Sequence, residues 1–142
     1  MSKEPIEFLK HISDECTYLL SVNKGLSKDA FLDDETLKRA VVRSLEIIGE
    51  ATKKIPADFK VKWSSIQWKN MAGMRDRLIH DYIGVNYTIV WDVFNNKIPE
   101  LYDQIQQVLN KQWIYRQHSI VSCSKRSLVC QPMNHQLWTI NH

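Results

Sequence analysis

Apolar residues recur at steps of three and four through most of the first 110 positions, a spacing typical of helices with one buried face. The first stretch runs from Glu4 to Val22, with Pro5 in its first turn and Gly25 after its end. A second runs from about Asp33 to Ile55, and Pro56 closes it. No strand-like alternation of useful length precedes residue 112, so the pattern predicts helices throughout this part.

Two further helices complete the predicted fold. Ser64 or Ser65 can cap a third helix that Gly84 ends. Asn86 can cap a fourth helix, which reaches about Leu109 and is expected to kink at Pro99. Short connections between helices favour antiparallel neighbours, so we predict an all-α, up-and-down bundle of four to five helices.

Gly49 lies inside the second predicted helix, where glycine costs about 1 kcal/mol relative to alanine. A glycine at such a position indicates that another backbone passes close by. We therefore expect a tight helix crossing at Gly49.

The length and the cysteines limit the class of protein. With 142 residues the chain is most simply one domain, long enough to bury roughly two-thirds of the surface that its unfolded form exposes. Its three cysteines are an odd count without a C-x2-C pair, and neither a signal peptide nor a membrane-length apolar run is visible. We expect a reduced, soluble, cytoplasmic protein that makes no membrane contact.

The last thirty residues differ in character from the rest. Positions 113–142 contain no acidic residue and no sustained period, whereas 1–112 hold 16 basic and all 16 acidic residues. We predict a helical domain over 1–112 and a C-terminal extension over 113–142. The extension offers His118, Cys123, Cys130 and His135 as conceivable zinc ligands, but the gap between its cysteines is not a zinc-knuckle spacing. We expect no metal and no cofactor.

An Arg-x4-His-x-Tyr pattern, formed by Arg75, His80 and Tyr82, lies at the end of the third predicted helix. An arginine keeps a permanent charge that suits a phosphate, and a histidine exchanges protons near neutral pH. Such a pair can assist phosphodiester cleavage without a metal ion. The adjacent Asp76 lies one turn before His80, where it is placed to accept a hydrogen bond from the imidazole.

Arg75 and His80 are five residues apart, which places them about 140° from each other around a helix. One helix alone therefore forms a poor site, and we predict a homodimer in which two copies of the helix face a common phosphate. A purely structural role is equally compatible with the spacing, because a histidine and a tyrosine in a last helical turn often stabilise the helix end. Lys69 and Arg77 flank the pattern and are candidates for contact with an RNA backbone.

The segments IIGEATKKIP and SSIQWKNMAGMRDRLIHDYIGVNYTIVWDVFNNKIPEL resemble the HepT-like branch of the HEPN superfamily, with the resemblance covering about residues 3–112. It implies an all-α bundle that dimerises and acts as the toxin of a toxin–antitoxin pair, with an MNT-type nucleotidyltransferase as antitoxin. By resemblance, Arg75 and His80 form a metal-independent endoribonuclease site, and Asp76 matches the polar residue after the arginine. Tyr82 matches the tyrosine to which the partner attaches AMP.

Two alternatives to a nuclease remain open. The first is a non-catalytic HEPN dimer that binds its nucleotidyltransferase partner or a nucleotide, with Arg75 and His80 holding phosphate only. The second is a helical interaction module in which His80 and Tyr82 pack at a dimer seam. Detection of RNA fragments with cyclic phosphate ends separates a nuclease from both.

Overall fold

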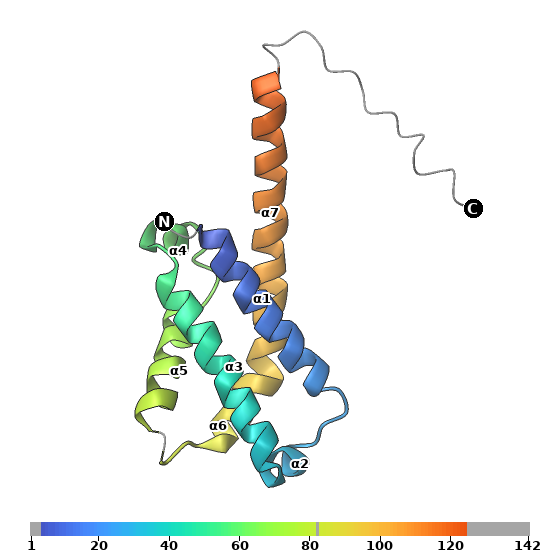
Figure 1. The fold of residues 1–142 in the computed structure, drawn as a ribbon, viewed down its shortest axis with the longest axis vertical. Helices are drawn as coiled ribbons and strands as arrows, with labels where there is room; N and C mark the ends of the chain where they lie inside the picture. Colours follow the sequence, from blue (N-terminus) through green and yellow to red (C-terminus); the bar gives the residue numbers. More distant parts are fainter. Residues whose placement is uncertain (1–3, 82, 125–142) are drawn as a thin grey trace, which may run out of the picture. The chain divides into compact units, whose positions relative to one another are not determined.

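The computed structural model describes the backbone of residues 4–81 and 83–124, with side chains for 4–81 and 83–117. All regular structure in these residues is helical (Figure 1), which confirms the predicted all-α class. The chain divides into two compact units, Met1–Asn110 and Lys111–His142. The elements are α1 Pro5–Val22, α2 Lys28–Asp33, α3 Glu35–Lys54, α4 Ala57–Lys62, α5 Trp68–His80, α6 Tyr87–Asp92, the π-helix η1 Val93–Lys97 and α7 Ile98–Ser124.

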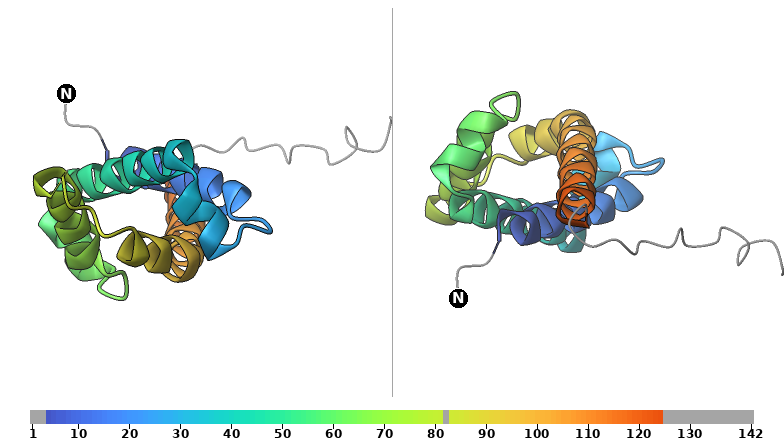
Figure 2. Two further views of the ribbon diagram at one scale, coloured as in Figure 1. Left: turned by 90° about the horizontal axis from the view of Figure 1, so that it is seen from below. Right: turned by 90° about the horizontal axis from the view of Figure 1, so that it is seen from above.

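Helix α3 is the central element of the first unit, because it packs against both α1 and α5 (Figure 1). The end-on views in Figure 2 show α3 and α5 meeting along one edge of this unit. Because α3 has a neighbour on two sides, a broad band of its surface is buried. Some residues of this band are small, which allows the helices to approach closely. The buried residues of α3 are Lys38, Val41, Ser44, Leu45, Ile48, Gly49, Ala51 and Thr52.

The second predicted helix is in fact two helices. Lys28–Asp33 forms the short α2, and α3 starts after Asp34, whose backbone is extended. The Asp34 carboxylate accepts a hydrogen bond from the Leu37 amide at 2.9 Å, and this cap begins the new helix. Phe31 of α2 is fully buried, so this short helix inserts the ring into the core.

The motif helix α5 is shorter than predicted at both ends. Ser64 and Ser65 lie in a turn and cap nothing, and the Trp68 indole instead donates to the Trp63 carbonyl at 3.0 Å as the helix begins. The helix ends at His80, before the predicted end at Gly84. The motif histidine is thus the last residue of α5.

The predicted cap at Asn86 is confirmed, since its side-chain oxygen accepts from the Thr88 and Ile89 amides at 3.0 and 3.3 Å. Where a kink at Pro99 was expected, the π-helical turn of η1 precedes the proline, and in it the Ile98 amide bonds to the Val93 carbonyl. Proline cannot donate a backbone hydrogen bond, so a change in hydrogen-bonding register ahead of it is expected. The helix does not end at Leu109, because α7 continues to Ser124.

The core of the first unit is formed by apolar residues from all of its long helices. Phe31, Trp91 and Phe94 lie with ring centroids 5.4 to 5.8 Å apart and join α2 to the α6–η1 segment. Buried positions of α7 recur at helical spacing, and they are Ile98, Leu101, Ile105 and Val108. Among the described residues, no helix has the length and apolarity that crossing a bilayer requires.

Cys16 lies on α1 and belongs to this core, where it is fully buried. Burial, with a smaller contribution from the nearby Glu15 carboxylate, raises the pKa of the Cys16 thiol to about 12. The thiol is therefore neutral at physiological pH.

Candidate functional site

Arg75 lies at the contact between α5 and α3, and only 26% of its side chain is exposed. Its guanidinium is bound by two carboxylates, Glu50 of α3 at 3.2 Å and the adjacent Asp76 at 3.0 Å. Glu50 also lies 3.6 Å from Lys54 on its own helix. The motif arginine is thus held in place by charged groups from two helices.

Asp76 links the same two helices through a second ion pair. Its carboxylate accepts hydrogen bonds from Lys53 of α3 and from Arg75. The Lys53 bond is the main cause, and the Arg75 bond the next, of a lowered Asp76 carboxyl pKa. The hydrogen bond expected from His80 to Asp76 is not formed, and Lys53 and Arg75 bind this carboxylate instead. Asp76 instead braces the arginine.

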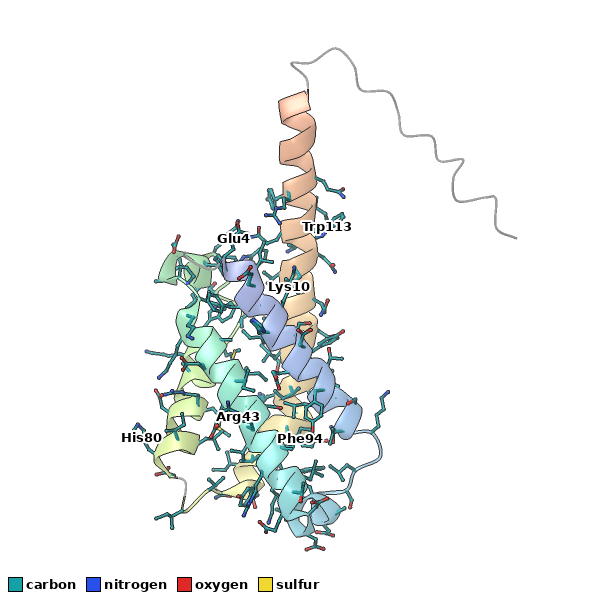
Figure 3. The ribbon with its side chains drawn as sticks, viewed as in Figure 1. Glu4, Lys10, Arg43, His80, Phe94 and Trp113 are labelled. Carbon is teal, nitrogen blue, oxygen red and sulfur yellow. The ribbon has the colours of Figure 1, made fainter. Side chains whose placement is uncertain are left out.

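His80 is exposed and has no hydrogen-bond or ion-pair partner among the residues whose side chains are described. Figure 3 shows it at the end of α5, on the side turned away from Arg43 of α3. Tyr82 lies outside the described residues.

A groove of about 270 Å³ runs between α1, α3 and α5, and Arg75 lines it whereas His80 does not. Basic, acidic and apolar side chains share its walls, among them Phe8, His11, Arg43, Glu46, Glu50, Lys54 and Ile79. A phosphate that enters this groove would reach an arginine that is already paired with Glu50 and Asp76. A second pocket, about 210 Å³, is lined from α3, α5 and the α6–α7 segment and contains none of the predicted site residues.

The remaining predicted RNA contacts lie apart from this groove. Lys69 is exposed in the first turn of α5, and Arg77 is exposed beside a separate depression near Gly84 and Asn86. The fold does not bring either side chain to Arg75. Among the side chains of 4–81 and 83–117, no cluster of histidine, cysteine and carboxylate groups could hold a metal ion, and the conceivable zinc ligands of the extension lie outside that set.

Sequence reasoning missed Lys53, His11 and Arg43 as neighbours of the motif. Lys53 and His11 lie on other helices, 22 and more positions before Arg75, and a linear pattern carries no record of such proximity. The one available signal was Gly49, which indicated a close crossing without naming the helix that crosses.

The family described as Ribonuclease HepT-like matches residues 7–108, which is more than half of the chain. The chain belongs to the HepT-like ribonuclease family. This confirms the membership that the sequence segments predicted, and the matched range corresponds to the helices from α1 into α7.

Relatives agree with this membership. The "Putative RNase TTE0752" of Caldanaerobacter subterraneus subsp. tengcongensis is 50% identical over 110 residues, which cover 78% of this chain and 98% of the relative. The "Putative RNase MJ0127" of Methanocaldococcus jannaschii is 40% identical, covering 75% and 88%. The "Probable ribonuclease HepT" of Thermococcus cleftensis is 36% identical, covering 76% and 98%. No solved structure matches the chain significantly.

Proposed function

We propose that this HepT-like protein is a metal-independent endoribonuclease and the toxin of a toxin–antitoxin pair. The observation that carries the proposal is the half-buried Arg75, fixed by two carboxylates at the edge of an open groove, in a chain whose relatives are named as ribonucleases. An arginine held in advance of the substrate can stabilise negative charge as it develops on a phosphate.

In the proposed reaction, the ribose 2′-oxygen attacks the adjacent phosphorus and the 5′-oxygen leaves. His80 accepts the 2′-hydroxyl proton, or donates a proton to the leaving oxygen, while Arg75 neutralises charge on the phosphorane. The products are a 2′,3′-cyclic phosphate and a 5′-hydroxyl. DNA lacks the attacking hydroxyl and is expected to remain intact.

The geometry of one protomer supports a site shared between two. Arg75 faces the groove between α1, α3 and α5, whereas His80 lies exposed at the end of the same helix. A two-fold dimer supplies the missing proximity if Arg75 of one protomer meets the histidine of its partner around one phosphate. We therefore retain the homodimer as part of the proposal.

The proposed antitoxin is an MNT-type nucleotidyltransferase that silences the nuclease by attaching AMP to Tyr82. In that transfer the tyrosine oxygen bonds to the α-phosphorus of ATP, and pyrophosphate leaves. The added phosphate carries negative charge, which would repel an RNA phosphate. Co-expression with such a transferase should increase the protein mass by one or more AMP units, whereas a Tyr82→Phe variant should stay unmodified.

The nuclease is tested by incubating the purified protein with labelled RNA and DNA in EDTA. We expect RNA fragments with cyclic phosphate ends and no DNA cleavage. Arg75→Ala and His80→Ala should each reduce the rate by roughly 10² to 10⁴, the range of general acid–base assistance. Arg39→Ala, which removes an exposed arginine of α3, is the control. Undiminished cleavage by both motif variants would refute the assignment.

One observation favours the non-catalytic alternative, in which the dimer only binds a nucleotidyltransferase or a nucleotide. The Arg75 guanidinium already binds Glu50 and Asp76, so a phosphate must compete with two carboxylates for it. In that case the same assay would show no cyclic phosphate ends, while binding of the transferase or a nucleotide would persist and would weaken in Arg75→Ala.

A further inference from the structure

We propose that Gly49 and Glu50 of α3 are positioning residues that fix where the Arg75 guanidinium lies. The inference rests on the proposed nuclease function for its effect on activity, but its structural part can be measured separately. Gly49 sets the distance between two helices, and Glu50 sets the direction of the arginine head.

Gly49 is buried where α3 meets α5, and the space beside it is occupied by the arginine stem. A Cβ atom added at Gly49 would lie 2.2 Å from the Arg75 Cβ and 2.9 Å from the Met71 carbonyl oxygen. Both distances are far below van der Waals contact, and the second involves backbone that cannot rotate away. Any side chain at position 49 therefore forces α5, and Arg75 with it, away from α3.

The close crossing explains why Glu50 reaches the arginine. Glu50 follows Gly49 directly, and its carboxylate lies 3.2 Å from one terminal nitrogen of Arg75, while Asp76 binds the other. The Arg75 Nε is shielded from solvent and has no hydrogen-bond partner among the described residues. With the stem enclosed and both terminal nitrogens bound, the planar head retains little rotational freedom.

Fixing the guanidinium in advance matters most in the transition state, where charge on the phosphate is greatest. Glu50 touches no reacting atom in the proposed reaction, so its loss should affect kcat more than KM. A displacement of about 1 Å in such a group can reduce a rate by about 100-fold. Gly49 and Glu50 thus control the chemistry without taking part in it.

The first test compares two glycine variants. Gly49→Ala should reduce kcat for RNA cleavage at least about tenfold with KM changed by less than about threefold. Gly73→Ala is the matched control, because Gly73 lies on α5 with nothing within 4 Å of an added Cβ. Equal kcat in the two variants would overturn the role of Gly49.

The second test uses Glu50→Gln, which keeps the side-chain size and removes the charge, so it preserves the fold even if Gly49→Ala fails to fold. We expect a loss of about five- to tenfold in kcat. Glu35→Gln is the control, since Glu35 pairs with Lys38 on the same helix and lies far from Arg75 in the chain. Equal kcat in the two glutamine variants would overturn the role of Glu50.

A measurement without RNA separates this inference from the nuclease proposal. The Arg75 Nε–H resonance, assigned by its loss in Arg75→Lys, should exchange slowly with water in the full-length protein and rapidly in Gly49→Ala and Glu50→Gln. If these changes occur in a protein that never cleaves RNA, the positioning role stands and the nuclease proposal fails. If the wild type cleaves RNA and the resonance is unchanged in both variants, the positioning role fails.

Discussion

At the scale of single residues, the environment of Arg75 decides what the motif can do. Glu50, Lys53 and Asp76 form with it a chain of alternating charges across the α3–α5 contact. The partly exposed pairs contribute little to stability individually, because solvent screens them. Their consequence is geometric, since together they limit where the guanidinium can go.

The lowered pKa of Asp76 leads to a pH prediction. The pKa of Asp76 is lower in the folded protein than in the unfolded chain. The stability that its ion pairs contribute is therefore fully present above the unfolded pKa, and it is lost as the pH falls through the folded-state pKa. Carboxyl NMR titration should show Asp76 with a midpoint below 3.8. In Lys53→Ala the midpoint should rise toward that value, because the main cause of the shift is removed. An unchanged midpoint in Lys53→Ala would contradict the ion pair.

Cys16 gives a second residue-scale prediction. Iodoacetamide should leave Cys16 unmodified in the native protein at pH 8 and alkylate it in 6 M guanidinium, as peptide mapping by mass spectrometry would show. Because folding raises the thiol pKa to about 12, the associated stability is intact below the unfolded value near 9 and is lost as pH rises toward 12. Rapid native alkylation of Cys16 would show that α1 is not packed as described.

The sequence predicted features that arise within one helix and missed a contact between two helices. Gly49 indicated the tight helix crossing that is found, because a glycine inside a helix points to a backbone close by. The sequence did not predict that Lys53 binds Asp76, because Lys53 lies on another helix. Contacts across helices depend on packing that local spacing does not encode.

At the scale of elements, the predicted start of a helix was correct where the predicted capping residue forms its hydrogen bonds. Asn86 was predicted correctly, since its oxygen binds two free amides of α6, whereas the serines ahead of α5 were not used. The α2–α3 break at Asp34 was missed because the apolar period continues across it.

Replacement of Asn86 by alanine should lower the free energy of unfolding by about 1 kcal/mol, the usual cost of losing such a cap. Urea denaturation of the variant measures this change. Asn110→Ala, at an exposed position of α7, should change the free energy by less than about 0.5 kcal/mol. Equal effects of the two substitutions would mean that the cap does not stabilise α6.

At the scale of the whole molecule, the family match and the buried residues cover nearly the same range. The match ends at residue 108, and Val108 is the last buried residue of α7 within the described side chains. Trp113, Ile114 and Tyr115 are exposed. We therefore propose that the helical domain does not require residues 113–142.

A chain that ends after Gln112 should fold, because it keeps the buried face of α7. Its free energy of unfolding should lie within about 1 kcal/mol of that of the full-length protein. Circular dichroism and urea denaturation provide the comparison, and the RNA assay tests whether cleavage is kept. A truncated chain that is unfolded or aggregated would show that the extension contributes to the domain.

The absence of a side chain at position 49 has a consequence for how members of such a family are judged. A single methyl group there would leave every letter of the Arg-x4-His signature intact and still displace the arginine that the proposed reaction requires. Survival of the signature is thus a poor guide to survival of the enzyme. Relatives that have lost activity but kept the motif should therefore be recognised by substitutions on the helix that packs against it.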